Sequence, residues 1–196
     1  MLNIKSNSFW TIPNILSLYR IVIFPFIFHL VLTQQEFLFS IFITISLVTD
    51  ILDGWIARTF KLQTEIGAKL DSWADLGTYI LAFLAIYVFK WSDIKPHSMI
   101  LVLFFVFWLV SYLYVFYKFR GLIGLHTYMF KLTGYFQGGF IVYLFLFGFQ
   151  PIVFYFALIW GTIACIEEII IIALLREPKT NVKGLYWVLK NHSKNP

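Results

Sequence analysis

The chain has 196 residues and a net charge of +5; 60% of its residues are hydrophobic and only 13% are charged. Soluble domains are about 45–50% apolar and about 25% charged, so this composition excludes an ordinary soluble protein and indicates an integral membrane protein. The basic residues are scattered among apolar runs, so we expect a lipid bilayer, and no nucleic acid, as the partner of this charge. The single Cys165 excludes an internal disulfide and a cysteine-based metal site.

Apolar stretches of about 20 residues predict an all-α integral membrane protein with six transmembrane helices. The polar start of the chain predicts no cleavable signal peptide, and residues 5–12 are expected to form a short interfacial helix on the membrane surface. Spans are then predicted over residues 13–32, 37–58, 66–89, 98–117, 124–148 and 152–175, followed by a basic cytosolic tail over 176–196. We expect residues 1–196 to form a single membrane-embedded domain.

Basic residues are distributed unevenly around these predicted spans. With six spans, both termini lie on one side of the membrane, and that side collects most of the Lys and Arg side chains outside the spans. The opposite side collects only Lys90 and Lys95. The positive-inside rule therefore predicts that both termini face the cytosol.

Carboxylates inside the predicted spans need an explanation, because a charge within a bilayer costs about 2.5–3.5 kcal/mol on insertion scales. Four of them fall near the cytosolic ends of the second and third spans: Asp50, Asp53, Asp71 and Asp75. At about 100° per residue each pair shares one helical face, so two antiparallel helices can direct all four carboxylates toward one another. Helix capping would explain one such aspartate, but four on matched faces need cations, and oxygen ligands favour Mg²⁺ or Mn²⁺. The pattern therefore predicts a site for two divalent cations.

Three neighbouring residues add to this chemistry. Gly54 and Gly67 lack side chains and would let a ligand approach the backbone, with close helix packing as the alternative role. Arg58 lies one turn beyond Gly54 and could pair with a phosphate oxygen, or anchor the helix at the cytosolic surface. Metal ions together with an arginine suit a pyrophosphate substrate, because positive charge stabilises the leaving group.

Written in order, these residues form one spaced motif, Asp50-x2-Asp53-Gly54-x2-Ala57-Arg58-x8-Gly67-x3-Asp71-x3-Asp75. The motif resembles the signature of the CDP-alcohol phosphotransferase (CDP-alcohol phosphatidyltransferase) family, with every element and spacer present. The resemblance implies an enzyme that transfers a phosphatidyl group from CDP-diacylglycerol to a small polar alcohol and releases CMP. It also implies a homodimer, and we expect the active site on the cytosolic face of a bacterial inner (plasma) membrane.

The same resemblance assigns roles to individual residues. It implies that the four aspartates ligate the two divalent cations, and that Asp75 is also the general base that takes the proton of the acceptor hydroxyl. The residues that it implies for binding the CDP-lipid are Gly54, Ala57, Arg58, Thr64 and Gly67.

The start of the first predicted span, residues 12–20, resembles the amino-terminal signature of phosphatidylglycerophosphate synthases and the related cardiolipin synthases. Asn14 and Ser17 would then contact the donor lipid, with helix capping as the alternative. Arg20 could equally be an anchor whose side chain snorkels to the interface. Ser72 and Leu76 depart from the pattern of these synthases, and an Asp-Ser pair recurs in serine- and inositol-type relatives.

The acceptor expected from this second resemblance is glycerol 3-phosphate. Lys131 lies within an apolar run and Arg120 lies just before that span, so both are candidate contacts to a phosphate on the acceptor; snorkelling is the alternative for Lys131. Serine, inositol phosphate and phosphatidylglycerol stay open as acceptors. An ion or proton transporter is the alternative from another class, because intramembrane carboxylates also mark ion pathways. Glu167 and Glu168 in the sixth span have no assigned role, although at least one should face a polar cavity.

Overall fold

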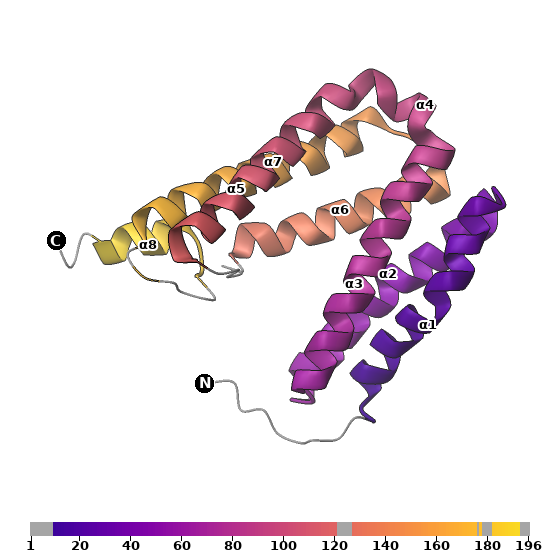
Figure 1. Cartoon of the computed structure of the whole chain (residues 1–196), viewed down its shortest axis with the longest axis horizontal. Coiled ribbons are helices and arrows are strands. Elements are labelled where there is room, and N and C mark those ends of the chain that lie inside the picture. Colours follow the sequence, from indigo (N-terminus) through magenta and orange to yellow (C-terminus); the bar gives the residue numbers. More distant parts are fainter. Residues whose placement is uncertain (1–9, 121–126, 176, 178–181, 193–196) are drawn as a thin grey trace. The chain divides into compact units, whose positions relative to one another are not determined.

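The structure is a computed structural model and describes residues 10–120, 127–175, 177 and 182–192 (Figure 1). Within these ranges the chain forms helices and turns and no strand, which confirms the predicted all-α fold. The α-helices are α1 (Ile12–Leu32), α2 (Glu36–Thr59), α3 (Glu65–Ala85), α4 (Trp91–Ile94), α5 (Ser98–Phe119), α6 (Tyr128–Phe147), α7 (Pro151–Leu174) and α8 (Leu185–His192). A π-helical turn, η1 (Ile86–Lys90), and a 3-10 turn, η2 (Lys95–His97), flank α4.

Five helical segments among the described residues are long and apolar enough to cross a membrane. Four of them are α1, α2, α6 and α7, and the fifth is the 54-residue stretch Ile66–Phe119, which contains α3, α4 and α5. At about 1.5 Å per residue this stretch far exceeds the roughly 30 Å thickness of a hydrocarbon core, so it is long enough for two crossings. The third and fourth predicted spans therefore fall within one helical segment, which η1 and η2 interrupt.

The observed helices overlap the predicted spans, but residues 124–126 of the predicted fifth span lie outside the described residues. Further differences lie at the two ends of the chain. Most of the predicted interfacial helix, residues 5–12, lies outside the described residues, and Trp10 and Thr11 precede α1 without being helical. The predicted tail contains α8, a helix that the sequence analysis did not anticipate. Its Val188 is buried against Ile171 and Ile172 of α7, so tertiary packing stabilises a helix too short to form alone.

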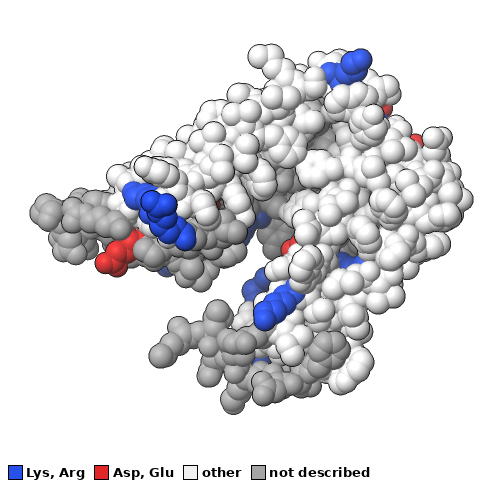
Figure 2. Space-filling model, viewed as in Figure 1, with Lys and Arg blue, Asp and Glu red and all other residues white. Residues whose placement is uncertain are grey.

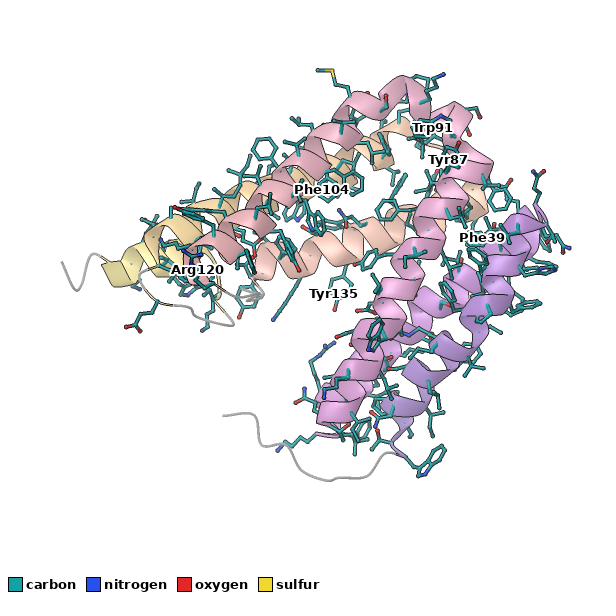
Figure 3. The ribbon with its side chains drawn as sticks, viewed as in Figure 1. Phe39, Tyr87, Trp91, Phe104, Arg120 and Tyr135 are labelled. Carbon is teal, nitrogen blue, oxygen red and sulfur yellow. The ribbon has the colours of Figure 1, made fainter. Side chains whose placement is uncertain are left out.

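The chain divides into two compact units, which are described separately: residues 1–92 with 141–148, and residues 93–140 with 149–196. In the first unit, α1 packs against both α2 and α3 (indigo to magenta in Figure 1). Phe39 of α2 is fully buried there (labelled in Figure 3), and its ring centroid lies 5.7 Å from that of Phe89 and 4.9 Å from that of Phe145. Aromatic packing thus fills the core of this unit.

In the second unit, α5 and α7 lie side by side. The ring of Phe104 on α5 (Figure 3) packs on Gly161 of α7, where an added Cβ would lie only 2.7 Å from the ring. Lys118 near the end of α5 donates hydrogen bonds to the carbonyl oxygens of Ile172 and Ala173, at 2.7 and 2.9 Å. A small residue and a charged cap therefore hold this pair of helices together.

The two glutamates of α7 have structural partners within the second unit. Glu167 Oε1 accepts a hydrogen bond of 3.0 Å from the backbone N–H of Leu185, the first residue of α8. Glu168 accepts a hydrogen bond from the hydroxyl of Ser111 on α5. One carboxylate therefore caps α8 and the other joins α7 to α5, which gives both a role that the sequence analysis left unassigned.

Uncharged side chains dominate the surface of the molecule. Figure 2 shows a face that is mostly white, with only a few basic and acidic groups. Large apolar side chains are widely exposed, among them Phe37, Met99, Val102, Phe147 and Ile152. Soluble proteins rarely expose so much contiguous apolar surface, whereas lipid chains solvate it readily.

Candidate active site

Helices α1, α2 and α3 bring the four predicted aspartates around one arginine. Asp50 and Asp53 belong to α2, Asp71 and Asp75 belong to α3, and the guanidinium of Arg20 comes from α1. Nη1 of Arg20 lies 2.6 Å from Asp50 Oδ1 and 2.9 Å from Asp75 Oδ1. Nη2 lies 3.0 Å from Asp53 Oδ2 and 2.7 Å from Asp71 Oδ1. We call these five residues the aspartate cluster.

The members of the aspartate cluster differ in burial. The side chain of Arg20 is 1% exposed and that of Asp53 is 4% exposed, whereas the side chains of Asp50, Asp71 and Asp75 are 37%, 44% and 42% exposed. Arg20 therefore lies on the buried side of the cluster, and three carboxylates keep part of their surface open. A ligand can reach the cluster from that open side.

The position of Arg20 was not predicted from its sequence context, which is equally compatible with an interfacial anchor. One signal could have found it: Arg20 is the one Lys or Arg residue in α1, and it is surrounded there by apolar residues. Four carboxylates on the two helices that follow need a counter-charge, and a cation within a membrane helix generally has a partner. The two requirements together point to a contact between Arg20 and the aspartates.

The donor set of the cluster fits a hard divalent cation. Asp50, Asp53 and Asp71 each offer one oxygen, and the three oxygens lie within 4.8 Å of one another. Asp75 is outside that group of three but shares Nη1 of Arg20 with Asp50. Carboxylate oxygens are the ligands that Mg²⁺ and Mn²⁺ prefer.

Three residues predicted to bind the CDP-lipid form one hydrogen-bonded group. Thr64 is the N-cap of α3, and its Oγ1 accepts a hydrogen bond of 2.9 Å from the backbone N–H of Gly67. Asn14 on α1 donates from Nδ2 to the same Oγ1 at 3.2 Å. The structure therefore brings Asn14, Thr64 and Gly67 together, although they are separated by up to 53 residues in the sequence.

Ser17 is one turn beyond Asn14 and is buried. Its hydroxyl lies 3.0 Å from Oδ2 of Asp53, the oxygen that Arg20 also contacts. It lies 3.2 Å from the carbonyl oxygen of Pro13 as well. Ser17 thus joins the aspartate cluster directly, and the N-cap of α1 is Thr11 instead.

Gly54 and Arg58 on α2 are neighbours in space as well as in sequence. A Cβ added at Gly54 would lie 3.2 Å from Nη1 and 3.4 Å from Nη2 of Arg58. The missing side chain therefore leaves room for the guanidinium to fold back along the helix. Arg58 is exposed and Ala57 is partly buried beside it, so the guanidinium is open to a ligand.

The two residues predicted to bind the acceptor belong to the second unit. Arg120 is exposed and follows the last residue of α5 (Figure 3), where its φ of 54° ends the helix in a left-handed conformation. Lys131 is exposed on α6, and its Nζ lies 5.8 Å from the centroid of the Tyr128 ring. Both are available cations on their own unit.

The family of the chain follows from comparison with known proteins. Residues 10–166 match the family described as CDP-alcohol phosphatidyltransferase. This match covers well over half of the chain and includes the whole aspartate cluster. The chain therefore belongs to the CDP-alcohol phosphatidyltransferase family, and the predicted family and enzyme class are confirmed. Together with the apolar helices, this membership makes the chain an integral membrane protein.

Individual relatives are similar over a shorter region. The CDP-diacylglycerol--glycerol-3-phosphate 3-phosphatidyltransferases of Escherichia coli (strain K12) and Shigella flexneri serotype 5b (strain 8401) are each 31% identical to the chain over 97 residues. The aligned region is 46% of this chain and 53% of each relative, so the chain spans about half the length of the curated relatives it matches. No solved structure gives a significant match to the chain.

Proposed function

We propose that this chain transfers a phosphatidyl group from CDP-diacylglycerol to the hydroxyl of a small acceptor and releases CMP. The observation that carries the proposal is the aspartate cluster, in which α2 and α3 place four carboxylates within reach of one guanidinium. Membership of the CDP-alcohol phosphatidyltransferase family supports the same reaction.

The four aspartates would hold two divalent cations, Mg²⁺ or Mn²⁺. When bound, such ions neutralise the pyrophosphate of the donor and stabilise the charge that develops on the leaving group. The geometry of Asp50, Asp53 and Asp71 supports this assignment, since their oxygens lie within 4.8 Å of one another. The open side of the cluster would receive the pyrophosphate.

The donor would be held by residues next to the cluster. The exposed guanidinium of Arg58 suits a phosphate oxygen of the donor, and Gly54 leaves it room to move. The other residues proposed to contact the CDP-lipid are Asn14, Ser17, Ala57, Thr64 and Gly67. All seven lie on α1, α2 or the start of α3, within the same compact unit as the aspartates.

Asp75 would act as the general base. Its carboxylate is 42% exposed, so an acceptor hydroxyl can approach it and give up its proton. The acceptor oxygen then forms a bond to the phosphorus that carries the diacylglycerol. The bond from that phosphorus to the bridging oxygen of the pyrophosphate breaks, and CMP leaves with the electron pair.

Glycerol 3-phosphate is the proposed acceptor. The support is the activity for which the relatives from Escherichia coli and Shigella flexneri are named. Lys131 and Arg120 are the proposed contacts to its phosphate. Serine, inositol phosphate and phosphatidylglycerol are alternative acceptors, and Ser72 favours the first two, because an Asp-Ser pair recurs in serine- and inositol-type relatives. The family match favours the enzyme over an ion or proton transporter.

The location of the chain is proposed from charge and similarity. The relatives come from bacteria, which supports a bacterial inner membrane. Most basic residues outside the predicted spans lie on the side that carries both termini, which supports a cytosolic position for the active site and both chain ends. The proposed working form is a homodimer.

A panel of acceptors tests the proposal. Purified protein in detergent would be incubated with labelled CDP-diacylglycerol, Mg²⁺ and glycerol 3-phosphate, serine, inositol phosphate or phosphatidylglycerol, one at a time. We expect CMP release and a labelled phosphatidylglycerophosphate product with glycerol 3-phosphate. Turnover with serine alone would refute the acceptor, and no CMP release with any acceptor would refute the reaction.

A further inference from the structure

Arg20 contacts the four aspartates of the cluster in an unusual pattern. Each of its two terminal nitrogens carries two N–H groups, and each nitrogen contacts one aspartate of α2 and one of α3. Nη1 bridges Asp50 and Asp75, while Nη2 bridges Asp53 and Asp71. All four terminal N–H groups are thereby matched with four separate carboxylates.

Each of these contacts uses a single carboxylate oxygen. The contacted atoms are Oδ1 of Asp50, Oδ2 of Asp53, Oδ1 of Asp71 and Oδ1 of Asp75. The four hydrogen bonds of the guanidinium do not involve the second oxygen of these carboxylates. Fixing one oxygen of a carboxylate restricts its rotation, and so it restricts the position of the other oxygen.

The charge and burial of Arg20 indicate that it orients the carboxylates and does not block access to them. Four carboxylates and one guanidinium leave three negative charges uncompensated, which still attract divalent cations. Arg20 is 1% exposed, whereas three of its partners are 37–44% exposed, so the guanidinium lies behind the carboxylates and not across their open side. Its Nε is buried without a hydrogen-bond partner, so the side chain meets the cluster through its terminal nitrogens alone.

Ser17 lies one turn before Arg20 on the same helix and adds a second contact at one carboxylate. Its hydroxyl lies 3.0 Å from Oδ2 of Asp53, the oxygen that Nη2 of Arg20 also contacts. Asp53 is the most buried of the four carboxylates, and it is the one held twice. Helix α1 therefore supports the cluster at two points, from its buried side.

We propose that Arg20, assisted by Ser17, is the positioning residue of the metal centre. It would hold one oxygen of each aspartate so that the other oxygens are already arranged when divalent cations bind. The proposal rests on the proposed function, because it assumes that the four aspartates bind these cations. Groups that orient metal ligands typically change metal affinity by about 10–100-fold when they are removed.

A direct binding measurement tests the proposal without relying on turnover. The affinity for Mn²⁺ would be measured by electron paramagnetic resonance titration of detergent-solubilised protein, for the wild type, Arg20→Lys and Ser17→Ala. Lysine keeps the positive charge but has one nitrogen, so it cannot match four carboxylates. We expect Arg20→Lys to bind Mn²⁺ about 10–100-fold more weakly, with a broadened spectrum from disordered ligands, while Ser17→Ala weakens binding less.

Two matched controls separate positioning from general damage. Lys90→Arg makes the reverse exchange at a cation that pairs with Glu36, outside the aspartate cluster, and Ser40→Ala removes a buried hydroxyl that donates only within its own helix, to the carbonyl of Glu36. Both should keep the Mn²⁺ affinity of the wild type. Size-exclusion chromatography and circular dichroism would check the fold of each variant. If Arg20→Lys does not fold, the Mn²⁺ affinity of Ser17→Ala, compared with that of Ser40→Ala, tests the proposal.

The outcomes distinguish the two proposals. A wild type that binds no Mn²⁺ would refute the metal site of the proposed function. A wild type that binds Mn²⁺, with Arg20→Lys or Ser17→Ala binding it equally or more tightly, would overturn the positioning role alone. Weaker binding by both variants, with unchanged binding by both controls, would support it.

Discussion

Asn14 of α1 and Thr64 ahead of α3 are joined by a hydrogen bond of 3.2 Å, from Nδ2 of Asn14 to Oγ1 of Thr64. The same Oγ1 accepts the backbone N–H of Gly67 and so caps α3. One hydroxyl therefore fixes both the start of α3 and its distance from α1. Asp71 and Asp75 follow on the next two turns of α3, so this small contact also sets where their carboxylates lie.

Gly67→Ala tests this contact. A Cβ at position 67 would collide with Oδ1 of Asn14 and would lie 2.8 Å from Oγ1 of Thr64, so both hydrogen-bonding groups must move. Loss of an N-cap costs about 1 kcal/mol, and we expect a lower melting temperature and a higher KM for CDP-diacylglycerol. Gly134→Ala in α6 is the control, because nothing lies within 4 Å of its added Cβ. If Gly67→Ala were as stable and as active as Gly134→Ala, the contact would have no such role.

Asp75→Asn tests the proposed general base. An amide cannot accept the proton of the acceptor hydroxyl, and loss of general base catalysis lowers rates by about 10²–10⁴. We expect kcat to fall by that factor while CDP-diacylglycerol still binds, as measured by turnover and by equilibrium binding of labelled donor. Asp93→Asn, at an exposed aspartate of α4, is the matched control. Activity of Asp75→Asn within a few-fold of the wild type would contradict the assignment.

Removal of divalent cations should stop the reaction. Four carboxylates near one guanidinium keep an excess of negative charge, and carboxylate oxygens are the ligands that hard divalent cations prefer. We expect a chelator to abolish CMP release, and added Mg²⁺ or Mn²⁺ to restore it. Full turnover in excess chelator, in protein shown by elemental analysis to be free of metal, would be incompatible with a metal-dependent enzyme.

Lys131→Gln tests the proposed acceptor contact. A charge-assisted hydrogen bond contributes about 1.5–3 kcal/mol, so its loss should raise the KM for glycerol 3-phosphate by about 10–100-fold. The KM for CDP-diacylglycerol should stay nearly constant, and Lys131→Arg should recover the activity only in part. Lys95→Gln, at another exposed lysine of the second unit, is the control. Equal changes in both Michaelis constants would argue against a contact specific to the acceptor.

Much of the fold and the clustering of the four aspartates could be predicted from the sequence. The length of the apolar stretches indicates where the membrane helices lie. The spacing of the aspartates shows that Asp50 and Asp53 share one helical face, and that Asp71 and Asp75 share another. These are local properties of the chain. Helix α8 could not be predicted in this way, because it is short and its stability comes from packing on α7 and from the cap provided by Glu167.

The role of Arg20 depends on a long-range contact. An isolated arginine in an apolar helix can be either an interfacial anchor or a buried counter-ion. The sequence alone does not show whether its side chain is buried. The choice depends on how α1 packs against α2 and α3, which brings together residues 30 to 55 positions apart. Ser17 has the same ambiguity, since serine hydroxyls commonly bond to their own helix.

The contacts of Arg20 also bear on how the chain enters the membrane during synthesis. Helix α1 emerges first, and a lone arginine near the middle of a span costs about 2.5–3.5 kcal/mol on insertion scales. Asp50 and Asp53 arrive with α2, and Asp71 and Asp75 arrive with α3, each carrying a similar cost of its own. Since α1 brings the positive charge that pairs with the carboxylates of α2 and α3, the three helices are expected to leave the translocation channel together, as one ion-paired group. The aspartate cluster would then be assembled once α3 has emerged, before α5, α6 and α7 enter the membrane.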